Sequence, residues 1–364
     1  MKTIFALIVS FLFGAFMGTA AGFDPIATGS ITTFAGIAAG SLGLMPTGVL
    51  SATIDLSLVN SQLNAYIKHN LPFIWSKVRQ GLELDQFARM VPNVQGKHAS
   101  ISSSQSEILQ AFQSQWTPKG GTTFTPLLNE SFHIKADYPI DNIDVLWGTY
   151  LEWLTDDQTR RDQWPFVRWV IETQIIPKLI EEINTGGCTG SYVAPTPGTP
   201  GTVANMMNGI LTQVSDMITA TTISPIVTGA ITSANGVSKV ETFVKSLDPK
   251  LRPNGKKNVI LTSNYVVECY KENYRAQWGN RDKEASNNAK LDMFNMELVG
   301  INAFGSSQRM IFAPEGNILK LFGKIGTPDR LETQIDKRDV NLLGDWWIGY
   351  GFATADLLFV NDQA

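Results

Sequence analysis

Hydrophobic positions alternate most clearly near the C-terminus. Residues 346–353 form two sets, with Trp346, Ile348, Tyr350 and Phe352 on one face and Trp347, Gly349, Gly351 and Ala353 on the other. This period of two predicts a β-strand. Glycines on one face predict that another element, which we expect to be a long helix, approaches the strand backbone closely. Residues 354–356 resemble a turn, so we expect residues 357–360 to return as the paired strand of a hairpin.

Helical periodicity is strongest between residues 141 and 185. Apolar positions recur on one side of this stretch at Ile143, Trp147, Leu151, Leu154, Phe166, Trp169, Val170, Ile176, Ile180 and Ile183. Pro165 suits the first turn of a second helix. Pro177 is expected to kink that helix, and Gly186 with Gly187 to end it. If it were continuous, the helix would be roughly 60 Å long at about 1.5 Å per residue.

Residues 91–138 are rich in Ser, Thr, Gln and Gly and contain scattered aromatic residues. A turn is predicted at residues 118–121, where Pro is followed by Lys-Gly-Gly. The pattern predicts a long two-stranded excursion that is too polar to have a core of its own.

After a Pro- and Gly-rich linker at residues 194–201, helical and strand patterns alternate. Helices are expected at residues 203–219 and 237–247. Strands are expected at residues 259–261, 297–301 and 309–312. A further helix begins after Ser263 as the N-cap and ends at Gly279.

The first 54 residues carry almost no charge, since Lys2 and Asp24 are the only charged side chains before Asp55. Ser10, Gly14, Gly18 and Gly22 recur every fourth residue, a spacing that allows helices to pack backbone to backbone. Three alternatives remain open for this segment. It is the core of a signal peptide cleaved at residues 18–22, a stretch long enough to cross a bilayer, or an arm retained in the working protein.

Composition narrows the functional classes. The chain has 364 residues, a formal charge of -4 and 17% charged residues, below the ~25% usual for soluble domains. Low charge predicts that much of the surface is covered by partners. The chain is not basic enough to wrap nucleic acid by counterion release. Two cysteines in a chain of this length predict free thiols.

Residues that could carry chemistry are sparse. The three histidines, at positions 69, 98 and 133, are not spaced as zinc ligands, and neither a phosphate-binding loop nor a nucleophile elbow is present. Cys188 lies in a Gly-rich segment that reads as a tight turn, and Cys269 reads as a core residue of a helix. The sequence therefore predicts a structural protein, with no enzyme activity, cofactor or metal.

Two segments resemble one known family. Residues 261–265, Leu-Thr-Ser-Asn-Tyr, are similar to its strand-to-helix step. Residues 310–319 are similar to its turn of Thr-Pro-x-x-Asn, with Ala313 in place of threonine and Asn317 at the asparagine. With the order of the elements, these segments resemble tailed-bacteriophage major capsid proteins of the Hong Kong 97 type, a fold shared with encapsulin shells.

The resemblance implies an α+β fold whose parts follow one another along the chain. These are an apolar N-terminal arm (1–60), short peripheral helices (61–85), an extended β-hairpin loop (86–140), a spine helix with its linker (141–202), an axial domain (203–310) and the return strands of the peripheral domain (311–364). Residues expected to matter for packing and assembly are Gly14, Gly18, Gly22, Trp147, Pro165, Asn317, Trp346, Gly349 and Gly351.

The family implies a function as well. A protein of this kind assembles in the host cytoplasm into hexamers and pentamers of an icosahedral virion shell, and encloses double-stranded DNA without sequence-specific contacts. Scaffolding, portal and decoration proteins are further partners that the family allows, and membrane contact is allowed but not favoured. No residues for a covalent cross-link can be placed. The alternatives are an exported bacterial surface or binding protein with a cleaved signal peptide, and an encapsulin-like compartment.

Overall fold

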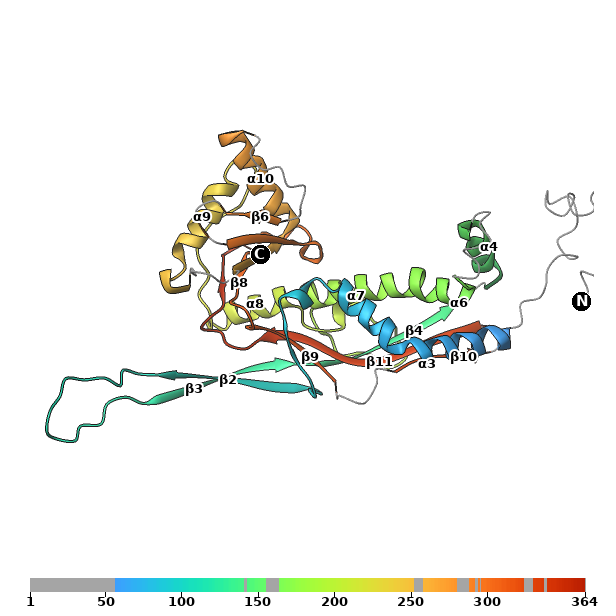
Figure 1. The fold of residues 1–364 in the computed structure, drawn as a ribbon, viewed down its shortest axis with the longest axis horizontal. Coiled ribbons are helices and arrows are strands. Elements are labelled where there is room, and N and C mark those ends of the chain that lie inside the picture. The colour runs from blue at the N-terminus through green and yellow to red at the C-terminus, as the bar shows by residue number, and fades with distance from the viewer. Residues whose placement is uncertain are drawn as a thin grey trace, which may run out of the picture. The chain divides into compact units, whose positions relative to one another are not determined.

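The computed structural model describes residues 56–140, 143–154, 164–251, 258–279, 288–291, 294, 296–323, 330–336 and 339–363. Gly14, Gly18 and Gly22 lie outside these residues. None of the helices within the described ranges is long and apolar enough to span a bilayer. The described residues build two five-stranded sheets and a separate two-stranded hairpin (Figure 1).

The first sheet is organised around one long strand, β11 (Asp339–Phe352). Along one edge, β11 pairs antiparallel with β10 (Arg330–Asp336) and then with β9 (Ile318–Phe322). Along the other edge it pairs with β4 (Phe132–Ile140), and β1 (Arg89–Val91) lies parallel to β9. The predicted strand at residues 346–353 is confirmed, and its bulky face is buried.

Helices pack against this first sheet. Helix α3 (Leu56–Gly81) contacts β10 and buries an apolar stripe at i, i+4 spacing that includes Leu63, Ile67, Ile74 and Val78. The predicted helical region contains α4 (Ile143–Leu154) and a continuous run made of α6 (Phe166–Trp169), a π-helical turn η3 (Val170–Ile175) and α7 (Ile176–Thr189). Pro165 is the N-cap of this run. Pro177, which lacks an N–H, is the second residue of α7 and lies in the turn that follows the π-helical segment.

The prediction that Gly186 and Gly187 end the helix is wrong, because α7 continues to Thr189 and is capped by Gly190. A Cβ at Gly186 would lie 2.2 Å from Met206 Cε, and one at Gly187 would lie 2.6 Å from Tyr350 Cε2. The two glycines therefore allow Met206 and Tyr350 to pack closely against the helix, whereas local sequence rules associate paired glycines with a helix end.

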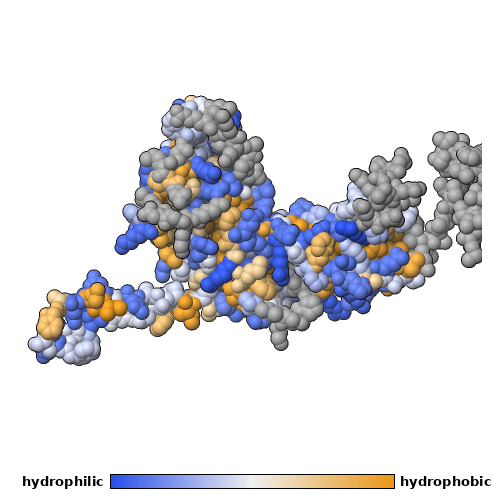
Figure 2. All heavy atoms as spheres, in the orientation of Figure 1, coloured by the Kyte–Doolittle hydropathy of each residue, from blue (hydrophilic) through white to orange (hydrophobic). Residues whose placement is uncertain are grey.

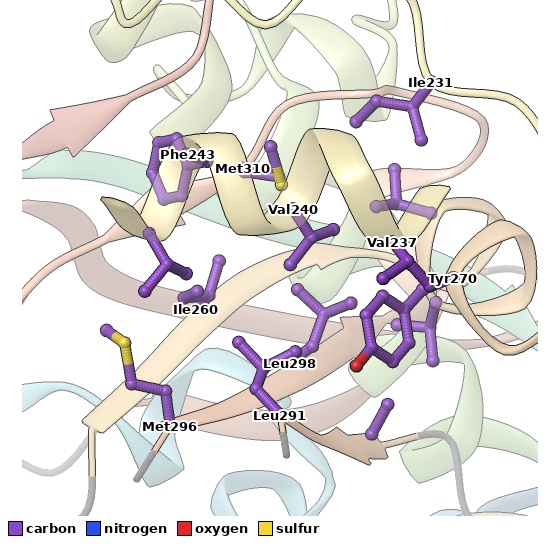
Figure 3. Packing of buried hydrophobic residues seen from close by; sticks show 14 of the residues in the cluster. Ile231, Val237, Val240, Phe243, Ile260, Tyr270, Leu291, Met296, Leu298 and Met310 are labelled. Atoms are coloured by element: carbon purple, nitrogen blue, oxygen red, sulfur yellow. The ribbon is translucent and has the colours of Figure 1, made fainter. Parts of the chain in front are cut away.

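The second sheet has the order β12-β8-β5-β7-β6. Its strands are β5 (Asn258–Ser263), β6 (Asn288–Lys290), β7 (Met296–Ile301), β8 (Ile311–Phe312) and β12 (Phe359–Val360). Helices α9 (Gly236–Ser246) and α10 (Asn264–Trp278) pack together beside this sheet. Side chains from both helices and from the strands form one buried apolar cluster, which Figure 3 shows around Val240, Ile260 and Leu298.

The predicted C-terminal hairpin is wrong. Residues 359–360 pair with β8 in the second sheet and do not return along β11. Buried hydrogen bonds hold this end: Met310 N donates to Asn361 Oδ1 at 2.8 Å, and Arg309 donates to the Asn361 carbonyl. A strand of two residues carries too little pattern to specify its partner, so these contacts between residues distant in sequence decide the pairing.

The remaining elements connect these parts. They are the hairpin strands β2 (Lys97–Gln105) and β3 (Thr122–Glu130), helix α8 (Ile210–Thr219), and the short 3-10 turns η2 (Leu84–Gln86), η4 (Val203–Asn205), η5 (Pro249–Leu251) and η6 (Asn302–Phe304). Helix α10 confirms its predicted ends, with Ser263 at the N-cap and Gly279 at the C-cap with a positive φ of 77°.

Candidate assembly surfaces

The β2–β3 hairpin is a two-stranded ribbon with two chemically different faces. In its antiparallel register Ala99 lies opposite Leu128, Ile101 opposite Pro126, and Ser103 opposite Phe124. Residues that face each other across a pair share one side of the ribbon, so these apolar residues form one face. We call this the apolar ribbon face. The other face carries Ser100, Ser102 and Ser104 opposite Leu127, Thr125 and Thr123, so it is polar apart from the half-buried Leu127.

The apolar ribbon face is uncovered. Ile101, Phe124 and Leu128 are each at least 66% exposed. An isolated two-stranded hairpin is marginally stable in water, and a ribbon with an exposed apolar face is a typical partner-binding element.

Residues 106–121, between the two strands, form the hairpin tip. Ser106 N donates to the Gly121 carbonyl at 3.0 Å, Lys119 Nζ donates to Glu107 Oε2 at 2.7 Å, and Gln110 Nε2 donates to the Thr117 carbonyl at 2.7 Å. These bonds hold the loop in shape without a core. The apolar side chains of the tip remain outside: Phe112 is 97% exposed and Trp116 is 87% exposed. Figure 2 shows orange hydrophobic residues along the hairpin out to its tip.

The root of the hairpin is locked to the first sheet through two glycines of β11. A Cβ at Gly349 would lie 2.3 Å from the Glu130 carbonyl oxygen, and a Cβ at Gly351 would lie 2.1 Å from Asn129 Oδ1. The close approach predicted at these glycines is therefore present. The approaching element, however, is the hairpin strand and not the spine helix, so that part of the prediction is wrong.

Asn129 fixes the position of the hairpin root against β11. Its side chain is buried, donates to the Phe352 carbonyl at 2.8 Å and accepts from Phe352 N at 2.9 Å. The amide thus copies the hydrogen bonds of a neighbouring strand. No local pattern in the sequence predicts this role, because it depends on Asn129 lying opposite the glycines of β11, more than 200 positions later in the chain.

Helix α4 carries further exposed apolar side chains. Its inner side packs Tyr150 and Leu154 into the chain, and Tyr150 Oη donates to the Trp164 carbonyl at 2.7 Å. Trp147, which lies 5.0 Å from the Phe166 ring between centroids, remains 39% exposed. The other exposed apolar residues of α4 are Val145, Leu151 and Trp153.

A buried carboxylate joins α3 to the π-helical turn. Glu172 accepts hydrogen bonds from Tyr66 Oη at 2.7 Å, from Arg168 Nε at 2.8 Å and from Lys77 Nζ. Burial raises the pKa of the Glu172 carboxyl, but the bonds from Lys77, Tyr66 and Arg168 outweigh burial and hold the pKa below its ordinary value. Burial raises the pKa of Tyr66, and its bond to Glu172 adds to that shift.

A second buried ion pair lies beside the first sheet. Lys320 Nζ of β9 is 2.5 Å from Asp85 Oδ2, and Tyr350 Oη donates to Asp85 Oδ1 at 2.9 Å. Burial raises the pKa of Tyr350 well above its ordinary value, and the neighbouring Asp85 raises it further. Removing one partner of such a pair leaves a buried charge uncompensated, so this cluster fixes the segment before β1 against β11.

The remaining expected packing residues take structural positions. Trp346 is buried and meets Trp75 edge to face with ring centroids 5.2 Å apart. Asn317 follows a turn at Pro314, and its Oδ1 accepts from Thr354 N at 2.9 Å while its Nδ2 donates to the Leu357 carbonyl at 3.3 Å. Asn317 therefore ties this turn to the segment that joins the two sheets.

Side chains that chemistry would need are not gathered. No group of three His, Cys, Asp or Glu residues that could hold a metal occurs in the part of the chain that the structure describes. The sequence predicts a tight turn at Cys188, but this prediction is wrong because Cys188 lies inside α7. Its side chain is fully buried, and burial raises the pKa of its thiol. His133 stacks on Trp347 with ring centroids 4.9 Å apart.

Comparison with known proteins gives a clear result for the fold. No protein-family model matches the sequence, and no curated protein is similar to it. The structure is similar to a chain of the satellite phage P4 procapsid, a structure that includes the size determination (Sid) protein, with a TM-score of 0.53 and 14% identity over 82% of this chain and 95% of that chain. It is also similar to a chain from the capsid of a native GTA particle, with a TM-score of 0.50 and 12% identity over 77% and 89% of the two chains.

The chain therefore has the capsid fold. The α+β fold of the Hong Kong 97 type, expected from the order of elements, is confirmed.

Proposed function

We propose that this protein is a major capsid protein that assembles with copies of itself into an icosahedral shell around double-stranded DNA. The observation that carries the proposal is the uncovered hairpin: a ribbon with one apolar face and an exposed aromatic tip, held by its root on a chain with the capsid fold. Such a surface is costly to leave in water, and a neighbouring subunit would cover it.

In this proposal the parts keep the roles that the resemblance implies. The first sheet with α3 and the spine helix forms the peripheral domain. Residues 203–310 form the axial domain, and β8 and β12, which were expected in the peripheral domain, complete its sheet. The hairpin lies across a neighbouring copy, and hexamers and pentamers are the units of the shell. DNA is enclosed without sequence-specific contacts, and scaffolding, portal and decoration proteins bind the outside or inside of the shell. The protein has a structural role, without catalysis, in a virion assembled in the host cytoplasm.

The test is the assembly state of the purified full-length chain. Size-exclusion chromatography and negative-stain electron microscopy are expected to show closed shells, or hexamer and pentamer rings. A monomer at high concentration that does not change with crowding agents or added scaffold would contradict the proposal and favour an exported protein. The mature N-terminus, measured by intact mass, then distinguishes a retained arm from a leader cleaved near residues 18–22.

A further inference from the structure

We infer that the second sheet contains a peptide-binding site, which the chain fills with its own C-terminal segment, residues 358–362, and that this segment can leave the site and rebind to it as a separate peptide. The site lies between β8, with residues 308–310 before it, and the loop of residues 226–229. The inference concerns the folded subunit and does not depend on its assembly into a shell.

The backbone of the segment is bound from two sides. On one side β12 pairs antiparallel with β8, and Asn361 N donates to the Met310 carbonyl at 3.3 Å. On the other side Ile226 N donates to the Val360 carbonyl at 2.8 Å, and Asp362 N donates to the Ile226 carbonyl at 3.0 Å. An extended peptide that adds a strand to the edge of a sheet is bound in this way.

Asn361 makes the first specific side-chain contact in the site. Its side chain is fully buried, its Oδ1 accepts from Met310 N at 2.8 Å, and its Nδ2 donates to the Gln308 carbonyl at 2.9 Å. The Arg309 side chain, which is also buried, donates to the Asn361 carbonyl. A residue without the amide would leave buried groups unpaired, which lowers the free energy of binding. The site therefore selects asparagine at this position.

Asp362 makes the second specific contact. Its carboxylate accepts from Thr228 N at 2.9 Å, from Thr228 Oγ1 at 3.0 Å and from Gly229 N at 3.1 Å. Gly229 has a positive φ of 70°, and two successive N–H groups point at the carboxylate, as in an anion-binding nest. Leu358 and Val360 are buried. The ligand is thus an extended peptide in which apolar residues are followed by Asn-Asp.

The segment is attached to the second sheet in a way that suits release and rebinding. Its strand pairing is limited to Phe359 and Val360. The buried members of the apolar cluster of this sheet come from residues 231–312, and Phe359 is only partly buried against them. Asp356 and Leu357, in the turn that joins the segment to β11, are exposed. We therefore expect the rest of the sheet to stay folded when the segment leaves.

The bound segment closes one edge of the second sheet. β12 is the end strand in the order β12-β8-β5-β7-β6, so its departure would leave β8 at the edge. Both residues of β8, Ile311 and Phe312, are apolar and fully buried. An uncovered apolar edge pairs readily with other strands. An empty site would therefore accept the same sequence from a second copy of the chain or from a free peptide.

Cleavage of the folded full-length protein tests the site. A protease recognition sequence is inserted between Asp356 and Leu357, and the protein is cut after folding. Native mass spectrometry is expected to show residues 357–364 still bound, with an unchanged circular dichroism spectrum. A fluorescent peptide of residues 357–364, added in excess, is expected to replace the bound segment and raise the anisotropy. Uncut protein is expected to bind it about tenfold more weakly or less, because its tethered segment competes at a high effective concentration.

The matched control peptide carries Asn361→Ala with Asp362→Ala and keeps the length and the apolar residues. It is expected to bind the cut protein at least about tenfold more weakly, because the buried amide contacts and the nest contacts are lost. Equal binding of the two peptides would overturn the inference. Loss of the cut segment without rebinding, or unfolding on cleavage, would overturn it as well. The assembly of wild-type protein is measured separately, so these outcomes leave the proposed function standing.

A second measurement uses the wild-type chain without an insertion. Carboxypeptidase is expected to remove residues 358–362 while circular dichroism stays unchanged, because the segment leaves by local opening. Removal is expected to be about tenfold faster in Asn361→Ala and unchanged in Asp356→Ala, which alters an exposed residue before the segment. The trimmed wild-type protein is expected to bind the fluorescent peptide. Trimming that proceeds only at the rate of global unfolding, or a trimmed protein that does not bind the peptide, would contradict the inference.

Discussion

The hairpin and the second sheet represent two ways in which this chain handles apolar side chains. In the second sheet, α9 and α10 enclose residues such as Phe243 and Leu298 so completely that no surface of either side chain is exposed (Figure 3). In the hairpin, the side chains of Phe112 in the tip and Phe124 in β3 are largely exposed to solvent. The same residue type thus contributes to the stability of the subunit in one region and is available for a partner in the other.

This difference separates the residues that stabilise the folded subunit from the residues that are available for assembly. The second sheet builds its core from residues 231–312, which form a nearly contiguous part of the chain. The hairpin holds its shape by backbone pairing, local hydrogen bonds and a root clamped at Asn129. We therefore expect mutations to separate into two groups, one that changes the stability of the subunit and one that changes only assembly.

The largest effect is expected from the matched pair Phe243→Ala and Phe112→Ala. Phe243→Ala removes a fully buried ring and is expected to lower the free energy of unfolding by about 3–5 kcal/mol. Phe112→Ala removes an exposed ring and should change it by less than ~0.5 kcal/mol. Urea denaturation of the unassembled subunit, followed by circular dichroism, measures both. Equal losses would show that the tip packs against its own chain and would remove the distinction between the two regions.

The hairpin root lies between these two extremes, and Gly349→Leu tests it. The new side chain would collide with the backbone at Glu130, which cannot move without breaking the pairing of β4 with β11. We expect a loss of about 3 kcal/mol, or failure to fold, from overpacking. Gly201→Leu is the control, because it has nothing within 4 Å of the added Cβ. Gly351→Leu should behave like Gly349→Leu; normal stability in either variant would mean that the root is not a clamp.

The root also shows what the sequence could and could not reveal. Period-two alternation predicted β11 and its bare glycine face, because both are local properties of consecutive residues. The identity of the element at that face depends on the pairing of Gly349 with a strand more than 200 positions earlier in the chain, which no local pattern encodes. For the same reason the local pattern predicts a helix end at Gly186 and Gly187, although in the structure these glycines leave room for Met206 and Tyr350.

The sequence predicts that the hairpin exists, but it does not predict that the hairpin has an apolar face. The polar composition of residues 91–138 predicted an excursion without a core. The alternation that places Ile101, Phe124 and Leu128 on one face becomes visible only when the register of β2 with β3 is known. The polar composition predicts that a deletion of residues 92–136 leaves the subunit folded but unable to build a stable shell. The structure instead favours a loss of stability, because the deletion would remove Phe132 and Ile134, which are buried in the first sheet. We therefore expect that only the tip, and not the whole excursion, can be removed without unfolding the subunit.

A smaller effect is expected at the C-terminal end of the second sheet, where Asp362 accepts from Thr228 N at 2.9 Å and Gly229 N at 3.1 Å. Burial raises the pKa of Asp362, but the bonds from Thr228, Gln363 and Gly229 outweigh it and lower the pKa to about 2. Because the folded pKa is below the unfolded value of 3.8, the stabilisation is present above pH 3.8 and is lost as the pH falls through 2.

Asp362→Asn should therefore destabilise the subunit by about 1 kcal/mol at pH 7, a figure that allows for solvent screening, and by only a small part of that near pH 2. Thermal unfolding of the unassembled subunit across this pH range measures the difference. Asp356→Asn, which changes an exposed carboxylate in the preceding turn, is the control. A difference that persists at pH 2 would assign the effect to packing and not to charge.

The smallest effect on subunit stability is expected from removing the tip. Ser106 N donates to the Gly121 carbonyl, so the two strands are still paired at this point. Replacing residues 107–120 by Asn-Gly closes the ribbon with the two-residue turn that suits a hairpin. The change discards Phe112 and Trp116 together with a long loop, and loops of this length contribute little to a core. We expect the free energy of unfolding to stay within about 0.5 kcal/mol of wild type, while assembly into rings or shells fails. Analytical ultracentrifugation and negative-stain images measure assembly, and denaturation measures stability. A shortened protein that assembles normally would show that the tip is not an assembly element, and one that unfolds would show that it is part of the core.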